Sequence, residues 1–291
     1  MVFLEVMDST DHALANREAL DINRDYAHNL GVTAKMAIDH GFYFTDTGEK
    51  VDWSSQVAAA RKATSSLSPS TPLPALPDTR LYITQVQVRN QTTMHAACDL
   101  IRQGSRPLAL NFASGTNPGG GFLGGARAQE ETLCRSSALH ATLYGDPFYE
   151  HHRTMARDYF SDWAILSPNV PFFREDDGGT LEEPYLLSIL TCAAPIAHRV
   201  GTEESRNLLR QRIDRVFHIA TAHGYKDLVL GAWGCGAFGN DPVTTAIDFK
   251  NALENKYDGY FEKVIFAITD WSPERRFLGP FAKHLSPNGR A

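Results

Sequence analysis

Two adjacent acids, Glu130 and Glu131, are the residues of this sequence best placed to carry out chemistry. They lie at the start of a helix that we predict from Gln129, directly after a glycine-rich stretch at residues 115–125. A carboxyl group in a cleft can donate and then accept a proton, as a general acid and base must. The same acids could instead only favour the helix dipole, as acids in a first turn often do.

The stretch before the acids has the features of an anion-binding loop. The apolar run at residues 108–112 predicts a buried strand, bounded by Pro107 and Gly115. The glycines that follow let backbone N–H groups approach a ligand closely. Because the loop leads into a helix N-terminus, whose free amides favour negative charge, a phosphate is the expected ligand. Acids at such a site would repel a phosphate, so we interpret them as evidence for catalysis.

A second stretch, residues 227–253, repeats the order of strand, glycine-rich loop and helix. Asp241 is placed to cap the helix, and Pro242 takes the first helical position, where proline is favoured. A second set of loop amides would then face a ligand, which indicates a diphosphate held from both sides. The alternative is that residues 231–239 form a plain turn between a strand and a helix.

The rest of the chain alternates strands and helices, which predicts an α/β sheet covered by helices on both faces. Ligands of such sheets bind beyond the carboxyl ends of the strands, where both glycine loops lie. The apolar run at 185–195 predicts a central strand. We expect an irregular tail at 271–291. The predicted strands are 81–88, 108–112, 162–176, 185–195 and 263–270, and the predicted helices are 92–102 and 203–223.

The N-terminal part has a different composition. Alanines, leucines and mixed charges predict helix within residues 8–40, and a second helix is expected at 54–64 after a hairpin-like link. Residues 65–78 contain four prolines among serines and threonines, which favours an extended connector. We therefore expect this part to be a structural cap.

Bulk properties exclude several classes of protein. A net charge of −6 argues against a general nucleic-acid surface, which is usually basic. No apolar run reaches transmembrane length, and the acidic start differs from a secretory peptide, so we expect an intracellular protein. The four cysteines show no CxxC spacing, and the histidines show no HExxH motif. We expect reduced thiols, no metal and no cofactor; a serine or cysteine hydrolase lacks support because GxSxG is absent.

The pattern GGG, seven residues, then QEE resembles the signature of poly(ADP-ribose) glycohydrolases. The longer run "NPGGGFLGGARAQEE" is similar to their microbial-type branch, which is built on a macrodomain. The resemblance implies a macrodomain-like mixed sheet sandwiched between helices, with a helical N-terminal extension. It divides the chain into residues 1–78, extension and connector, and residues 79–291, the catalytic domain.

The resemblance also implies roles for individual residues. Glu131 corresponds to the catalytic acid and Glu130 to the residue that positions the ribose, a distinction that the sequence alone does not make. Phe238 resembles the aromatic residue that orients the terminal ribose, unless it is a core ring that holds the loop down. The other implied ADP-ribose contacts are Asn117 at the distal ribose, Gly119, Gly120 and Gly121 in the diphosphate loop, Gln129, and Gly234, Cys235, Gly236, Ala237 and Gly239 in the second loop.

The implied activity is hydrolysis of ribose–ribose O-glycosidic bonds in poly(ADP-ribose), which releases ADP-ribose and reverses ADP-ribosylation, for example in a DNA damage response. Glu131 would protonate the departing ribose oxygen and then, as a carboxylate, activate the attacking water. The substrate would be the polymer or ADP-ribosylated proteins. We expect no membrane partner, no sequence-specific nucleic-acid binding, a monomer, and a cytoplasmic location, or a nuclear one in a eukaryote.

Several alternatives remain at this stage. The protein could remove single ADP-ribose groups from protein or nucleic acid, or could bind ADP-ribose without cleaving it, although a reader would not need the acid pair. A structural or nucleotide-binding regulator would turn over no ADP-ribosylated substrate. Asp270 and Phe266 are candidates for contacting the adenine, and Trp271 is expected to pack rather than to stack on a base.

Overall fold

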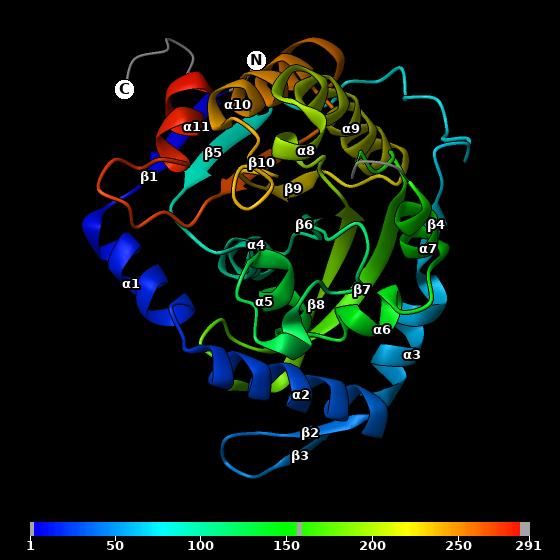
Figure 1. Ribbon diagram of the computed structural model, residues 1–291, viewed down its shortest axis with the longest axis vertical. Coiled ribbons are helices and arrows are strands. Elements are labelled where there is room, and N and C mark those ends of the chain that lie inside the picture. The colour runs from blue at the N-terminus through cyan, green and yellow to red at the C-terminus, as the bar shows by residue number, and fades with distance from the viewer. Residues whose placement is uncertain (1–2, 156–158, 286–291) are drawn as a thin grey trace.

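The computed structural model describes residues 3–155 and 159–285 and places one mixed eight-stranded sheet at the centre of the chain (Figure 1). Six neighbouring strands, β1, β5, β10, β9, β6 and β8, run parallel. Strand β7 is antiparallel to β8, and β4 is antiparallel to β7. In spatial order the strands are β1 (Phe3–Met7), β5 (Gln85–Arg89), β10 (Lys263–Ala267), β9 (Asp227–Leu230), β6 (Leu108–Phe112), β8 (Thr180–Cys192), β7 (Ala164–Arg174) and β4 (Ser65–Leu67).

Helices cover both faces of the sheet, as the α/β prediction requires. On β6, Leu108 and Leu110 pack into the core under α9, α10 and α11, whereas Ala109 packs into the core under α4 and α5. This alternation follows from the two-residue period of a strand. The principal helices are α1 (Thr10–Leu20), α2 (Arg24–His40), α3 (Ser54–Ala63), α4 (Thr93–Arg102), α5 (Gln129–Ser136), α9 (Thr202–Ala222), α10 (Pro242–Asn251) and α11 (Leu278–Leu285).

Four shorter helical segments lie in the connections of the chain. They are η1 (Phe122–Gly124), α6 (Leu139–Leu143), α7 (Pro147–Thr154) and α8 (Ala197–Val200). A π-helical turn, η3 (Ala252–Lys256), continues α10. No helix among the described residues is long and apolar enough to cross a lipid bilayer.

The N-terminal predictions are confirmed for the helices and the hairpin, but two strands were not predicted. Helices α1, α2 and α3 form where expected, and β2 (Phe42–Phe44) pairs with β3 (Lys50–Asp52) as the hairpin. However, β1 pairs with β5, and β4, inside the predicted connector, pairs with β7. Both strands are short and lie at the edges of the sheet, so they show little of the pattern that marks a buried strand. Residues 1–78 therefore contribute to the main sheet, while the division at residue 79 stays a prediction.

The expectation of an irregular tail is also wrong, because α11 forms within it. Pro280 lies in the first turn of this helix, where the backbone N–H has no intrahelical partner and proline is tolerated. Phe281 and Leu285 are buried against the core under α10. Tertiary packing of this apolar face, rather than local sequence, explains the helix.

Helix α2 braces the glycine-rich loop that precedes α5. Gly31 lies so close to η1 that a Cβ atom there would stand 2.5 Å from the carbonyl oxygen of Phe122. Arg24 Nε also donates to the carbonyl of Gly124 at 2.9 Å, and His28 Nδ1 lies 2.6 Å from the carbonyl oxygen of Leu123. The N-terminal extension therefore fixes the loop from outside.

This close approach predicts that Gly31→Ala destabilises the protein, although glycine to alanine normally favours a helix. The added methyl group must push α2 away from η1, and the free energy of unfolding should fall by about 1–3 kcal/mol, measured by urea denaturation. Gly124→Ala is the matched control, since a Cβ atom there meets nothing within 4 Å. Equal stability of the two variants would contradict the role assigned to α2.

Candidate active site

Both glycine loops emerge at the same edge of the sheet. Strands β6 and β9 are parallel neighbours, so their carboxyl ends lie side by side. The first loop, residues 113–128, leads into α5, and the second, residues 231–241, leads into α10. The predicted cap is confirmed: the Asp241 carboxylate accepts from Val243 N and Thr244 N, both at 3.2 Å, and Pro242 takes the first helical position.

The first loop wraps around the acid pair. Gly120 has a left-handed backbone with φ of 59°, and a Cβ atom there would stand 2.2 Å from Glu131 Oε1 and 2.9 Å from Glu130 Oε2. Only glycine allows the chain to pass at this distance without displacing the acids.

Protein groups occupy three of the four carboxylate oxygens in the pair. Glu130 Oε2 accepts from Ser114 N at 2.7 Å, and Glu130 Oε1 accepts from Asn111 Nδ2 at 3.3 Å. Glu131 Oε1 accepts from Gly121 N at 2.9 Å. Glu131 Oε2 is buried and has no hydrogen-bond partner among the described residues. One oxygen of the pair thus remains for a ligand.

Burial sets the protonation of the first acid. Glu130 is 3% exposed, and desolvation raises the pKa of its carboxyl to about 8. The hydrogen bonds from Ser114 and Asn111 lower this pKa, whereas the neighbouring charge of Glu131 raises it. Near neutral pH, Glu130 therefore holds a proton, and the pair carries at most one negative charge.

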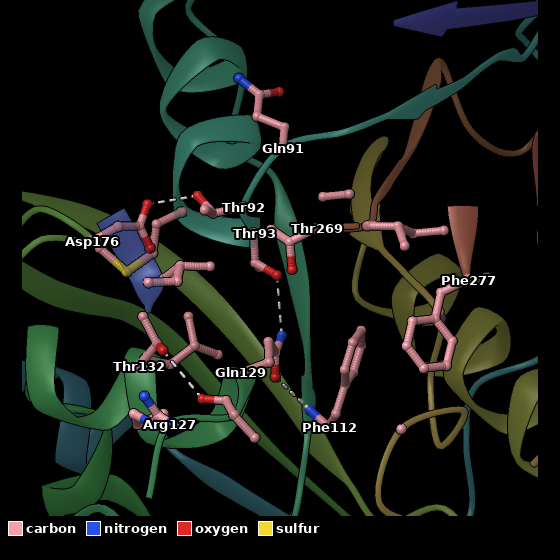
Figure 2. Close-up of a pocket in the computed structure, with 18 of the residues that line it drawn as sticks. Gln91, Thr92, Thr93, Phe112, Arg127, Gln129, Thr132, Asp176, Thr269 and Phe277 are labelled. Carbon is pink, nitrogen blue, oxygen red and sulfur yellow. Dashed lines mark hydrogen bonds between the residues drawn. The ribbon is translucent and has the colours of Figure 1, made fainter. Parts of the chain in front are cut away.

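Gln129 connects the acid helix to strand β6. Its side-chain oxygen accepts from Phe112 N at 2.9 Å, and its side-chain nitrogen donates to the carbonyl of Leu110 at 2.8 Å and to Thr93 Oγ1 at 3.2 Å (Figure 2). The amide pairs with the backbone of β6 at Leu110 and Phe112, so it fixes where α5 begins and where the acids point.

Two cavities meet at the ends of these strands. The acid cavity has a volume of about 210 Å³, and the side cavity beside it has about 390 Å³. Both are lined by Phe112, Ala128, Gln129, Ala232 and Gly236, so they adjoin. The acid cavity is further lined by Ser114, Glu130, Glu131, Ala194, Trp233, Gly234, Ala237 and Phe238.

The side cavity combines an apolar wall with polar side chains, of which Figure 2 labels Thr92, Arg127 and Asp176 among others. Met94, Leu133 and Ile268 contribute to its wall. At one end Asp176 accepts from Thr92 Oγ1 at 2.6 Å through Oδ2, while its buried Oδ1 has no partner among the described residues. Such a cavity is suited to a flat apolar ligand that carries a hydrogen-bond donor.

The predicted site residues divide into two groups. Seven of them line the acid cavity: Glu130, Glu131, Gln129, Gly234, Gly236, Ala237 and Phe238. Six line neither cavity: Asn117, Gly119, Gly120, Gly121, Cys235 and Gly239. Asn117 is exposed, Cys235 is buried with its thiol directed to the carbonyl of Trp233, and Gly121 supports Glu131 through its N–H.

Sequence reasoning also missed or misjudged cavity residues. Phe266 is fully buried in the core, and hydrogen bonds within the chain occupy both carboxylate oxygens of Asp270, so neither candidate faces a ligand. Trp271, expected to pack, is 42% exposed and lines the side cavity. Ser114 and Asp176 carried no local motif; only the pairing of distant segments brings them to the cavities.

All four cysteines are free and buried. Within residues 3–155 and 159–285, no group of three or more His, Cys, Asp or Glu side chains is arranged to hold a metal ion.

Comparison with known proteins agrees with this geometry. The family described as "Microbial-type PARG, catalytic domain" matches residues 33–175. The crystal structure of poly(ADP-ribose) glycohydrolase (PARG) from Thermomonospora curvata is 37% identical and covers 89% of this chain and 99% of its own, with a TM-score of 0.83. Its complex with the inhibitor ADP-HPD is 37% identical, with coverages of 89% and 98% and a TM-score of 0.82.

A PARG from Deinococcus radiodurans in complex with ADP-ribose is also similar. It is 37% identical, covers 79% of this chain and 96% of its own, and has a TM-score of 0.71. None of the curated proteins matches the chain.

The raised pKa of Glu130 predicts that stability falls as the pH rises. The folded protein holds this proton up to about pH 8, whereas an unfolded glutamate releases it near 4.5. The stability that Glu130 contributes is fully present below pH 4.5, the pKa in the unfolded chain, and is lost as the pH rises through about 8, the pKa in the folded protein. Between about pH 7, where ordinary histidine is mostly neutral, and about pH 8, the free energy of unfolding should fall by about 1 kcal/mol.

Urea denaturation at the two pH values measures this fall. Glu130→Gln should flatten it, because the amide does not titrate, whereas Glu49→Gln, a change at an exposed acid, should leave it in place. An unchanged fall in Glu130→Gln would show that another group is responsible.

Proposed function

The chain belongs to the microbial-type poly(ADP-ribose) glycohydrolase family, and we propose that its two cavities bind one ADP-ribose unit with Glu131 at the glycosidic bond. The fold is macrodomain-like, and the activity is that of a glycoside hydrolase, which cleaves the ribose–ribose O-glycosidic bonds of poly(ADP-ribose). The residues that carry out this reaction here are the subject of the proposal.

The single observation that carries the assignment of Glu131 is its unoccupied Oε2. Glu130 uses both carboxylate oxygens to hold Asn111 and the loop at Ser114, so it is poorly placed to transfer a proton to a substrate. Glu131 lines the acid cavity, and its buried Oε2 has no hydrogen-bond partner in the part of the chain that the structure describes. Burying such an oxygen is costly unless a ligand completes its hydrogen bond.

The two loops are suited to hold the diphosphate. The second loop lines the acid cavity opposite the acids and leads to the N-terminus of α10, while the first leads to that of α5. The cap of Asp241 occupies the first amides of α10, so the backbone amides of the two loops and the start of α5 are the groups that would hold a polyanion without a basic surface, consistent with the net charge of −6. The terminal ribose would then lie by Phe238 and the acid pair.

The adenosine would occupy the side cavity. Its apolar wall suits a purine, and the free Oδ1 of buried Asp176 can accept a hydrogen bond from an exocyclic amine. Trp271 lies at the same cavity with 42% of its surface exposed, so its ring is available to the ligand.

The chemistry follows from these positions. Glu131 protonates the departing ribose oxygen as the C1–O bond breaks through an oxocarbenium-like transition state. The resulting carboxylate then takes a proton from the water that attacks C1, which regenerates the acid. Glu130 holds the loop and the ribose, and its own retained proton means that it adds no second negative charge once Glu131 has become a carboxylate.

Two alternatives concern the substrate rather than the site. Release of single ADP-ribose groups from protein or nucleic acid would use the same acid, and comparing polymer with mono-modified targets separates the two. A protein that only binds ADP-ribose has no use for a free acid oxygen.

We further propose a monomer in a reducing, cytoplasmic compartment, which the four free thiols support.

We predict that Glu131→Gln lowers kcat for polymer hydrolysis by about 10²–10⁴ because it removes the general acid and base. The dissociation constant for ADP-ribose, measured by calorimetry, should stay within about threefold, because binding relies on the loops and the side cavity. Thermal unfolding checks that the variant is folded. Hydrolysis at the parent rate would refute the role of Glu131.

A second prediction tests the placement of ADP-ribose. Gly236 lines both cavities, and a Cβ atom there meets nothing within 4 Å. Gly236→Val should therefore leave the thermal unfolding temperature unchanged but fill the junction of the cavities, weakening ADP-ribose binding by about tenfold or more. Gly124→Val, which also meets nothing within 4 Å but lies outside both linings, is the matched control. Unchanged affinity in Gly236→Val would overturn the placement.

A further inference from the structure

One wall of the side cavity is formed by a loop that follows β10. This segment, residues 268–278, is called the cavity loop; Thr269, Trp271 and Phe277 are among its cavity-lining residues. It contains no regular structure before α11, so its shape depends on side-chain hydrogen bonds.

Asp270 holds the cavity loop from within. Its Oδ1 accepts from Ser272 N at 3.0 Å and from Ser272 Oγ at 2.6 Å. Its Oδ2 accepts from Phe277 N at 2.7 Å and from Leu278 N at 3.1 Å. The carboxylate thus closes the loop on itself and sets the direction of Trp271 and Phe277.

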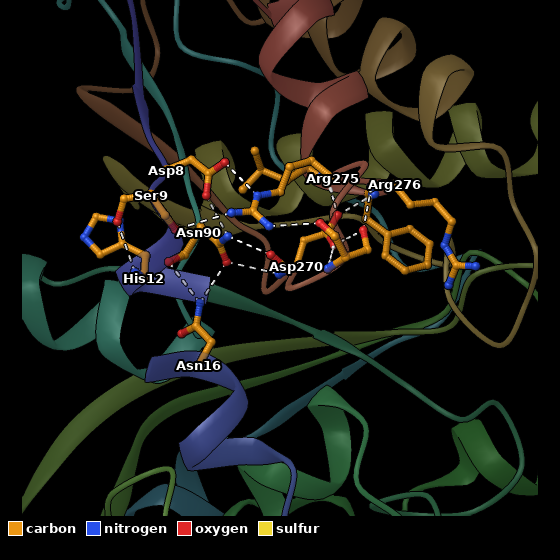
Figure 3. A network of polar contacts seen from close by, with 11 residues as sticks. Asp8, Ser9, His12, Asn16, Asn90, Asp270, Arg275 and Arg276 are labelled. Atoms are coloured by element: carbon orange, nitrogen blue, oxygen red, sulfur yellow. Dashed lines mark hydrogen bonds and ion pairs between the residues drawn. The ribbon is translucent and has the colours of Figure 1, made fainter. Parts of the chain in front are cut away.

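Asn90, 3% exposed, ties this loop to the N-terminal part of the chain (Figure 3). Its amide donates to Asp8 Oδ1 and to the carbonyl of Asp270, both at 2.8 Å. Its side-chain oxygen accepts from Asn16 Nδ2 at 2.8 Å and from Asp270 N at 3.0 Å. These four bonds use the two donors and two acceptor sites of the amide, so it is fully committed to the network.

A second link joins the same segments. Arg275 Nε donates to Asp8 Oδ2 at 2.8 Å, and Arg275 also donates to the carbonyls of Ser272 and Ser9. Arg275 has a φ of 48°, a left-handed conformation that residues with side chains rarely adopt, so these contacts must hold it there. Asp8 therefore pairs with both Asn90 and Arg275, and its two oxygens are divided between them.

The N-terminal segment also reaches the cavity directly. Leu20 and Asp21, at the end of α1, line the side cavity, and Asp21 accepts from Arg127 Nη1 at 3.3 Å. Residues 8–21 thus hold the cavity loop at their start and form part of the cavity wall at their end.

We propose that Asp8, Asn90 and Arg275 are positioning residues that pre-organise the cavity loop for the adenosine end of the substrate. The proposal rests on the placement of adenosine in the side cavity. A wall that is already ordered costs less conformational entropy on binding than one that the ligand must order. Loss of the link weakens binding but leaves the acid pair, and hence the chemical step, in place.

Asp8→Asn in the full chain tests this directly. The amide can still accept from Asn90 through one oxygen, but its NH₂ group then faces the Arg275 donor. We expect KM for polymer hydrolysis and the dissociation constant for ADP-ribose to rise about five- to tenfold, with kcat within about twofold. Arg275→Gln should act alike, and the double variant should be no worse than either single one, because both break the same link.

Asp214→Asn is the control. It breaks an ion pair to Lys256 of the same 2.8 Å length, and neither residue lines the acid or side cavity. It should leave KM and kcat at their parent values. Thermal unfolding of every variant separates local loosening from loss of the fold.

Tryptophan fluorescence provides a second measurement, because a purely structural role of Asp8 would not shift the ADP-ribose titration of Trp271. Trp271 is 42% exposed and lines the side cavity, whereas Trp233 is fully buried and lines the acid cavity. The difference in emission between the parent and Trp271→Phe on addition of ADP-ribose therefore isolates the signal of Trp271. This Trp271 signal should appear at about five- to tenfold higher ADP-ribose in Asp8→Asn.

The outcomes distinguish this proposal from the one on which it rests. If Gly236→Val weakens binding but Asp8→Asn changes neither KM nor the fluorescence titration, the positioning role is wrong. If Gly236→Val also leaves ADP-ribose binding unchanged, the placement of adenosine in the side cavity is wrong, and the positioning proposal that rests on it falls with it. A fall in kcat for Asp8→Asn with KM unchanged would overturn the positioning role as well.

Discussion

The burial of two adjacent carboxylates is the constraint on which the rest of the site depends. Glu130 and Glu131 are 3% and 8% exposed, and buried acids need hydrogen-bond donors or a retained proton. The first glycine loop supplies two of the three donors from its backbone, at Ser114 and Gly121, and it can approach only because Gly120 has no side chain. The shape of the loop is therefore determined by its hydrogen bonds to the buried acids.

Supporting elements act on that loop from several distant parts of the chain. Gln129 ties the start of α5 to β6, and the close approach at Gly31 fixes η1 against α2. The parallel pairing of β6 with β9 brings the second loop opposite the first. A site that must hold a diphosphate and a ribose at one acid needs such rigid support, since small displacements of reacting groups cost much of the rate. Helix α2, through Gly31, Arg24 and His28, is thus one of the elements that support the loop beside the acid pair.

Much of the site could be predicted because its signals are local. Glycines before a helix, acids in its first turn, and Asp241 with Pro242 at the next helix each act within a few residues. The structure brings the two loops to the same edge of the sheet. The residues that could not be predicted, such as Asp176, Trp271 and Asn90, depend on contacts between segments far apart in the chain. Asn90 joins residues near both ends, and nothing in its neighbours indicates this.

By itself the sequence determined the α/β alternation, the two loops and the identity of the acid pair, because strand period, helix caps and glycine backbone freedom are short-range properties. Only the tertiary structure decided which oxygen of the pair is available. Glu130 and Glu131 are neighbours with the same chemistry, and their difference arises from donors at Asn111, Ser114 and Gly121. Burial and hydrogen bonding to folded backbone, which no local pattern encodes, leave Glu131 Oε2 as the free oxygen.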